Sequence, residues 1–254
     1  MQLKPNQGMG VALVTGAGRG LGAEISVALA EAGADVVVAS RTRSELEQVA
    51  NRIVLRGGRA RVLVCDVTDG ASVRAGIESL ERLDVLVNNA GTIFVKPFVE
   101  VSEETLDKQL DLNVRGTFLV AQAAVRKMLE APDRKERGGV VINMSSQLGH
   151  VGLEGRTAYC MTKHAIEGLT KAMAVEFGPH NIRVNSIAPT FVETPMTLPR
   201  LSDPAFREWV TGKIPLGRIG RIADVTDAII FLASSASSLM TGTSLVIDGG
   251  WTAQ

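Results

Sequence analysis

One tyrosine and one lysine have the spacing of an acid–base pair. Tyr159, the only tyrosine in the 254-residue chain, lies four residues before Lys163. Residues at i and i+4 of a helix share one face, with Cβ atoms about 5–6 Å apart. A tyrosine hydroxyl has a pKa near ~10 in water and is therefore a poor base at neutral pH. Because a nearby ammonium group lowers the pKa of an acid, we expect Lys163 to lower the pKa of Tyr159 and to fit it for general acid–base catalysis.

A serine hydroxyl precedes this pair. Ser146 lies 13 residues before Tyr159, just after the apolar run 140–144, which we expect to be a strand. A hydroxyl in this place could hydrogen-bond a substrate oxygen and hold it against Tyr159; only the spacing favours Ser146 over Ser145. His150 follows Ser146 by four residues and is a further candidate for a substrate contact, although a histidine in a turn is more often structural.

A glycine-rich segment, TGAGRGLG at 15–22, joins an expected strand to an expected helix. Backbone N–H groups at the positive end of a helix bind a pyrophosphate, and glycines let the backbone approach it closely. The candidate residues here are Gly16, Arg19, Gly20, Leu21 and Gly22. No Gly-Lys-Ser/Thr ending follows, so this is not a nucleoside-triphosphate loop. A tight turn without a ligand is the alternative.

The end of the second expected strand indicates which dinucleotide binds. A carboxylate about 20 residues after the glycine loop would bind the ribose 2′-hydroxyl of NAD. The segment 40–43 is Ser-Arg-Thr-Arg and has no acid. Beside Ser40, Arg41 can pair with a 2′-phosphate in a bidentate manner, and Arg19 is a second cation. We therefore predict NADP(H), with NAD(H) as the alternative; a solvated strand-end charge is the other interpretation of Arg41.

Polar residues also follow the third and fourth expected strands, where ligands of doubly wound sheets bind. Asp66 and Val67 end the third, and an Asn-Asn-Ala-Gly run at 88–91 follows the fourth. The candidates of that run are Asn89, Ala90 and Gly91. Taken alone, Asp66 is equally well explained as a helix cap or turn residue.

Apolar strands alternate with amphipathic helices along the whole chain. The expected strands are 11–15, 35–40, 60–65, 84–87, 140–144, 183–187 and 244–247. The expected helices are 20–32, 44–55, 69–80, 105–129 (in one piece or two), 158–177 and 221–232. This alternation predicts an α/β fold, a single-domain doubly wound parallel sheet over residues 1–254 with helices on both faces. The charged segment 130–139 is expected to be a solvated loop. Five prolines between 188 and 220 indicate a substrate loop at about 189–215.

Composition excludes several classes of protein. Lys plus Arg and Asp plus Glu both number 27, which argues against bulk electrostatic binding of nucleic acid or anionic membrane. The two cysteines form no CxxC pair, so we expect a cytoplasmic protein. We expect no signal peptide in residues 1–10, no membrane-spanning helix and, without HExxH spacing, no metal site.

The motifs TGxxxGxG, NNAG, Ser146 and YxxxK occur here in the order typical of the short-chain dehydrogenase/reductase family, and the chain resembles that family throughout. The resemblance implies hydride transfer between nicotinamide C4 and a carbonyl or secondary alcohol carbon. Tyr159 would transfer the hydroxyl proton, Lys163 would also bind the nicotinamide ribose, and Ser146 would orient the substrate. Asn113 matches the family's fourth residue, which supports a water-mediated proton relay; a helix kink or cap is its alternative role.

Further implications of the resemblance concern the ends of the cofactor and the assembly. The segment PTFVET at 189–194 resembles the family's Pro-Gly-x3-Thr, in which Pro189, Val192 and Thr194 would lie at the nicotinamide carboxamide. Thr190 replaces the usual glycine, which leaves the geometry of that turn open. The positions after the third and fourth strands would contact the adenine. The family further implies a homotetramer with two-fold interfaces, one of them commonly formed by the helix that carries Tyr159.

We therefore predict an NADP(H)-dependent oxidoreductase for a small-molecule substrate. His150, Glu154 and Arg156 suit a sugar acid or polyol, unless Glu154 and Arg156 pair with each other. The chain resembles bacterial gluconate or deoxygluconate dehydrogenases of the family. A 3-oxoacyl-carrier-protein reductase, in which basic residues of the substrate loop meet an acidic partner, is the alternative; those residues are Arg200, Arg207 and Lys213. A non-catalytic dinucleotide-binding regulator is a third hypothesis.

Overall fold

A seven-stranded parallel sheet forms the centre of the computed structural model, which describes residues 10–254. The strands are β1 (Val11–Thr15), β2 (Asp35–Ser40), β3 (Arg59–Val64), β4 (Val85–Asn88), β5 (Gly139–Met144), β6 (Ile182–Pro189) and β7 (Ser244–Ile247). Their order is β3-β2-β1-β4-β5-β6-β7, and every pairing is parallel. The order reverses direction at β1, so the predicted doubly wound sheet is confirmed. Residues 1–9, most of the segment expected to lack a signal peptide, lie outside the described residues.

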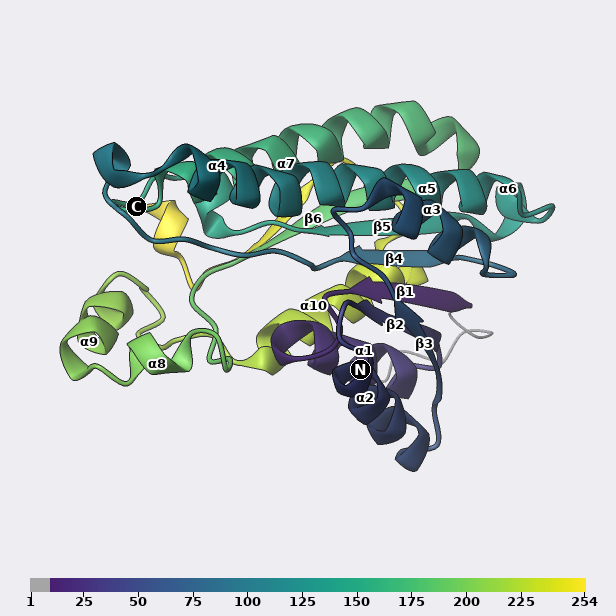
Figure 1. The fold of residues 1–254 in the computed structure, drawn as a ribbon, viewed down its shortest axis with the longest axis horizontal. Helices are drawn as coiled ribbons and strands as arrows, with labels where there is room; N and C mark the ends of the chain where they lie inside the picture. The colour runs from purple at the N-terminus through teal and green to yellow at the C-terminus, as the bar shows by residue number, and fades with distance from the viewer. Residues whose placement is uncertain (1–9) are drawn as a thin grey trace.

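Helices cover both faces of the sheet, as Figure 1 shows. One face carries α1 (Gly20–Glu31), α2 (Arg43–Leu55) and α10 (Ile222–Ala233), and the other carries α3 (Gly70–Glu78), α4 (Glu103–Leu110), α5 (Thr117–Leu129) and α7 (Thr157–Phe177). Side chains alternate along a strand, so Ala12 and Val14 pack toward α1 while Leu13 packs toward the α5 face. Within residues 10–254, none of the helices has the length and apolar character needed to cross a membrane.

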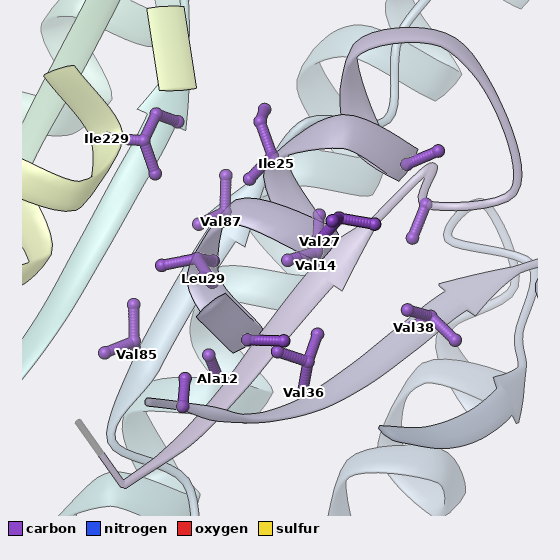
Figure 2. Close-up of a cluster of buried hydrophobic side chains, with 14 of the residues drawn as sticks. Ala12, Val14, Ile25, Val27, Leu29, Val36, Val38, Val85, Val87 and Ile229 are labelled. Carbon is purple, nitrogen blue, oxygen red and sulfur yellow. The ribbon is translucent and has the colours of Figure 1, made fainter. Parts of the chain in front are cut away.

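The core on the α1 face is drawn in Figure 2. Ile25 and Leu29 lie one helical turn apart on α1 and are fully buried against Val14 of β1 and Val87 of β4. Burying each such side chain contributes about 1.5–3 kcal/mol. This packing fixes where α1 starts relative to the end of β1, and therefore the shape of the glycine loop between them.

The helix expected over 105–129 is interrupted. Between α4 and α5, residues Asp111–Gly116 form a π-helical turn. Such turns inside α-helices are frequent at functional sites because the extra residue redirects a side chain. Here the turn contains Asn113, which is 1% exposed. The helix is thus in pieces, and the break falls at a predicted site residue.

The segment 130–139, predicted to be a solvated loop, is exposed at residues 130, 132 and 135–137 but is corrected in two respects. It contains the short helix α6 (Arg134–Arg137), and Arg134 is only 5% exposed. Its guanidinium donates to the carbonyl oxygens of Met128 and Leu83 and lies 3.9 Å from the Asp84 carboxylate. Charged composition indicated exposure, but tertiary partners bury this arginine.

The predicted substrate loop contains two short helices, α8 (Leu198–Leu201) and α9 (Pro204–Gly212), which lie together at one end of the molecule in Figure 1. They have a small apolar core of their own, formed by Leu201, Val210, Ile214 and Ile219. Trp251, near the end of the chain, packs partly buried against this core. The loop is therefore an ordered structure held by its own apolar contacts.

Candidate active site

The glycine loop has the conformation that its residue types predict. Gly16 and Gly20 have φ angles of +63° and +57°, in the left-handed region that favours glycine. A Cβ atom on Gly22 would lie 2.3 Å from the carbonyl oxygen of Gly16, so no side chain fits there. Helix α1 begins at Gly20, and its first N–H groups face the loop. The segment forms a cradle for an anion.

The Asn-Asn-Ala-Gly turn holds this loop from the neighbouring strand. The side-chain amide of Asn89 donates to the carbonyl oxygen of Thr15 at 2.9 Å. In return, the backbone N–H groups of Asn89 and Ala90 donate to the Thr15 hydroxyl at 3.0 and 3.1 Å. The carboxyl ends of β1 and β4 are thus locked together beside the glycines.

A cavity of about 600 Å³ opens at these strand ends. The predicted cofactor residues that line it are Gly16, Arg19, Gly20, Leu21, Gly22, Ser40, Arg41, Asp66, Val67, Asn89, Ala90, Gly91, Pro189, Val192 and Thr194. Ser146, Tyr159 and Lys163 line the same cavity. Residues from six strand ends and from helices α1 and α7 therefore meet in one place, whereas Asn113 and His150 do not line it.

The three catalytic candidates come from two elements. Ser146 follows the end of β5, and Tyr159 and Lys163 occupy one face of α7. The Lys163 ammonium donates to the carbonyl oxygen of Met144 at 2.7 Å and lies 5.5 Å from the centroid of the Tyr159 ring. This hydrogen bond ties α7 to β5, and so fixes the tyrosine relative to the serine.

Burial controls the acid–base properties of this group. It raises the pKa of Tyr159 to about 12, an effect that hydrogen bonding with Ser146 opposes. It lowers the pKa of Lys163 to about 8, and the Glu167 carboxylate one turn further along α7 opposes that change. The pKa of Tyr159 is therefore raised and not lowered as expected, because desolvation of the phenolate is the largest effect.

Asn113 acts through a neighbouring loop. Its side-chain oxygen accepts from the Thr92 N–H at 2.8 Å, and its amide donates to the Thr92 carbonyl oxygen at 2.8 Å and to the Thr162 hydroxyl at 3.1 Å. Thr92 lines the cavity. Asn113 thus fixes one cavity wall to α7, and the relay suggested by the family resemblance remains a prediction.

His150 is placed differently from the expectation. Its Nε2 lies 2.9 Å from the Ser244 hydroxyl and 3.4 Å from the Glu167 carboxylate, on the β7 side of α7. These polar partners hold the imidazole outside the cavity lining. His150 therefore lies outside the cavity lining, and its contact with a substrate stays a prediction.

Thr190 fits its turn without strain. Among residues 10–254, Asn181 is the only non-glycine residue with positive φ, so a threonine replaces glycine here at no conformational cost. The Thr190 N–H donates to the Ile247 carbonyl oxygen at 3.0 Å. Thr190 lines the cavity, and its hydroxyl is buried without a hydrogen-bond partner in the part of the chain that the structure describes. An unpaired buried hydroxyl of this kind is suited to bind a polar ligand group.

The opposite end of the cavity carries two arginines and two carboxylates. Arg19 lies 4.0 Å from Glu45, and Arg41 lies 3.9 Å from Asp66. The strand end at Ser40 gives no indication of Glu45, which lies five residues further along the chain. Helix α2 begins directly after that strand, and its first turn brings this acid back to the cavity.

The cavity is also lined by residues that the sequence motifs did not indicate. They are Gly18, Thr42, Cys65, Thr92, Ile93, Leu112, Met144, Ser145, Thr190, Pro195, Met196 and Thr197. Most of them adjoin a selected motif, and extending each motif by one or two residues would have found them. Met196 and Thr197 lie in the substrate loop, where no spacing rule indicated which residues turn inward.

Comparisons with known proteins agree with this geometry. A family model described as enoyl-(acyl carrier protein) reductase matches residues 16–252. A solved short-chain type dehydrogenase/reductase from Mycobacterium marinum has a TM-score of 0.90 and 41% identity, covering 98% of both chains. The chain belongs to the short-chain dehydrogenase/reductase family. The family resemblance noted from its motifs is thereby confirmed.

Two other relatives of this short-chain dehydrogenase/reductase have more specific names. L-xylulose reductase of Bos taurus is 40% identical over 242 residues, which cover 95% of this chain and 96% of that protein. A gluconate 5-dehydrogenase from Burkholderia cenocepacia J2315, solved with NADP and tartrate, has a TM-score of 0.93 and 34% identity, covering 99% and 98% of the two chains. The predicted enzyme class, a dehydrogenase/reductase acting on alcohol and ketone groups, is confirmed.

Proposed function

We propose that this enzyme interconverts a ketone and a secondary alcohol on a small hydroxylated substrate, a sugar, sugar acid or polyol, with NADP(H). One observation carries the proposal: Ser146, Tyr159 and Lys163 line the same cavity as the glycine loop. The named substrates of the xylulose reductase and the gluconate dehydrogenase support the substrate class. NADP in the gluconate dehydrogenase complex supports the cofactor.

The residues present fit NADP(H). No side chain fits at Gly16 or Gly22, where a Cβ atom would meet the neighbouring backbone or Asn89, so the phosphates would be bound by backbone N–H groups of the glycine loop. Thr190 lines the cavity at the other end. Arg41 and Arg19 would bind the 2′-phosphate. The carboxamide would be held by Val192 and Thr194, and the nicotinamide ribose by Tyr159 and Lys163. When bound, NADP(H) supplies or accepts a hydride at its nicotinamide ring.

The proton chemistry follows from the tyrosine environment. With a pKa of about 12, Tyr159 is protonated at neutral pH and serves as a general acid in carbonyl reduction. Ser146 donates a hydrogen bond to the substrate oxygen and holds it beside the phenol. Lys163, positively charged below a pKa of about 8, stabilises the phenolate that remains. Asn113 would support reprotonation through a water-mediated relay.

Arg156 and Glu154 do not line the cavity, and the ion pair given as their alternative role does not form. Arg156 is 6% exposed, and its guanidinium donates to the backbone carbonyl of Glu154 at 2.9 Å rather than to the carboxylate. Burial and the nearby Arg200 lower its pKa. Two cations thus lie near each other beside the substrate loop.

The 3-oxoacyl-carrier-protein reductase alternative has weaker support; the matched family model is described as an enoyl-(acyl carrier protein) reductase, which shares the carrier but reduces a C=C bond rather than a ketone. The alternative needs basic side chains available to an acidic partner. Arg207 instead forms an ion pair with Glu193, and the Arg200 guanidinium lies 4.3 Å from the centroid of the Phe206 ring. These two side chains have partners within the substrate loop, whereas Lys213 is exposed.

A substrate screen tests the proposed function. Oxidation of NADPH is followed with pentuloses, keto-sugar acids, simple ketones and a 3-oxoacyl thioester, with Tyr159→Phe as the control. Turnover of hydroxylated ketones by the wild type alone is expected. Preference for the thioester would favour the alternative. If both proteins bind NADPH and neither reacts, a regulator is the better interpretation.

Cytoplasmic location and a homotetramer are also part of our proposal. Cys65 and Cys160 are both free thiols, in keeping with a reducing compartment. Phe118 of α5 and Met161 of α7 are 48% and 47% exposed on the outer helix layer, and apolar side chains of this size suit a two-fold contact. Light scattering of the purified protein measures the assembly directly.

A further inference from the structure

A carboxylate enters the phosphate end of the cavity from helix α2, although the end of strand β2 carries none. Glu45 lies in the first turn of α2 and lines the cavity beside Ser40 and Arg41. Its side chain reaches the glycine loop, because a Cβ atom placed on Gly18 would lie 2.9 Å from Glu45 Oε2 and 3.0 Å from its Cβ. Gly18 thus leaves the space that this acid occupies.

The two acids at this end of the cavity are held differently. Asp66 accepts hydrogen bonds from the backbone N–H and hydroxyl of Thr68 at 2.9 and 2.8 Å, in addition to its contact with Arg41. These bonds fix it to its own turn. Within the described residues Glu45 makes one polar contact, the 4.0 Å ion pair with Arg19. Unlike Asp66, Glu45 is held by no hydrogen bond in the part of the chain that the structure describes, and its partner Arg19 is one of the two cations predicted to bind the 2′-phosphate.

We propose that Glu45 sets how strongly this site prefers a 2′-phosphorylated dinucleotide over an unphosphorylated one. The inference rests on the proposed function, because it takes NADP(H) to occupy this cavity. A ribose 2′-phosphate carries about −1.5 to −2 charges at pH 7, so it competes with Glu45 for Arg19 and is repelled by the carboxylate. A ribose 2′-hydroxyl can instead donate a hydrogen bond to a carboxylate.

Glu45 is thus a repulsive element that moderates selectivity, in the sense that discrimination depends on unfavourable contacts as well as favourable ones. Arg41 attracts the 2′-phosphate and Glu45 opposes it. The balance keeps NAD(H) usable as a second cofactor in a site that prefers NADP(H).

Binding of nucleotide fragments tests this without requiring turnover. Wild type and Glu45→Gln are titrated by calorimetry with adenosine 2′,5′-bisphosphate and with 5′-AMP. Loss of the charge is expected to increase the affinity for the bisphosphate about two- to fivefold, the range for partly exposed charges. The affinity for 5′-AMP should stay unchanged or decrease. The selectivity ratio therefore rises.

Glu47→Gln is the matched control. Glu47 lies on the same helix, pairs with Arg43 at 3.8 Å and does not line the cavity, so its loss changes net charge equally. In an Arg19→Gln background, Glu45→Gln is expected to give a smaller gain in bisphosphate affinity, because the arginine for which Glu45 and the 2′-phosphate compete is absent. The same ratio change in Glu45→Gln and Glu47→Gln, or none in either, would overturn the inference while leaving the proposed function intact. Failure of the wild type to bind either nucleotide would overturn the proposed cofactor and the inference together.

Discussion

The ammonium of Lys163 donates a 2.7 Å hydrogen bond to the backbone carbonyl of Met144, the last residue of β5. This bond joins the helix that carries Tyr159 to the strand that leads into Ser146. Lys163 is 6% exposed, so the bond also satisfies a buried donor that would otherwise be costly. The Lys163 side chain therefore positions Tyr159 relative to Ser146 and also supplies the positive charge beside the phenol.

Replacing Lys163 should remove both contributions. Lys163→Met is expected to lower kcat/KM for ketone reduction at least ~100-fold, the scale of lost acid–base catalysis, while circular dichroism shows the fold retained. Lys171→Met, on the exposed side of the same helix, is the control and should keep wild-type activity. Equal losses in the two variants would mean that the helix, rather than the ammonium, is being perturbed.

The pKa of Lys163 predicts a pH profile. Burial lowers it to about 8, so the ammonium is present below this pH and is lost above it. The rate of ketone reduction at saturating NADPH should therefore decrease as the pH rises through about 8. The measurement is kcat against pH, and the residual activity of Lys163→Met should lack this step. A step of the same position and size in that variant would assign it to another group.

Arg41 provides a test of the cofactor assignment. Its side chain is 76% exposed and lines the cavity, so Arg41→Asp should fold normally while placing an acid at the strand end. KM for NADPH should rise at least ~10-fold, because a charge-assisted contact worth about 1.5–3 kcal/mol is lost. KM for NADH should change little. Similar increases for both cofactors would refute the 2′-phosphate role.

How much the sequence could predict depends on how far apart the interacting residues lie. The glycine loop and the Tyr159–Lys163 pair were predictable, since their geometry follows from local spacing on one turn or one helix. The sheet followed from the alternation of apolar strands and helices. The prediction of a lowered pKa for Tyr159 was wrong. Its burial depends on how α7 packs against the cavity, and residue spacing does not indicate that packing.

Tertiary partners explain the remaining differences. The charged sequence around Arg134 predicted exposure, but its guanidinium is buried and donates hydrogen bonds to the carbonyl oxygens of Leu83 and Met128. His150 follows Ser146 closely, but its partner Ser244 lies 94 residues further along the chain. Glu45 was overlooked because helix α2 turns back toward the glycine loop. Each of these contacts joins elements that only the folded chain brings together.

Gly22 should tolerate no side chain. The Cβ of Gly22→Ala would lie 2.3 Å from the Gly16 carbonyl oxygen and 2.5 Å from the Asn89 amide nitrogen, so the loop must open. We expect a loss of ~1–3 kcal/mol in the free energy of unfolding, as for other overpacked sites, and a large loss of NADPH affinity. Gly212→Ala, where no atom lies within 4 Å, is the control and should leave both unchanged. Normal NADPH binding by Gly22→Ala would contradict the cradle.

A surface pair at the start of α10 gives a stability prediction with a defined sign. Hydrogen bonding from Arg218 at 2.6 Å, together with the Arg221 N–H, lowers the pKa of Asp224 from 3.8 to about 2. The unfolded chain therefore binds this proton more readily, so the stabilisation is fully present above about pH 4 and is lost as the pH falls through about 2.

Asp224→Asn should consequently reduce the free energy of unfolding by ~1 kcal/mol at pH 7, a modest value because the pair is partly exposed. Urea unfolding at pH 7 and near pH 2.5 measures the difference, which should shrink at the lower pH. Asp227→Asn removes the same charge from an exposed position of the same helix and should have little effect at either pH. If the cost of Asp224→Asn were independent of pH, the carboxylate would act through its shape as a helix cap and not through its charge.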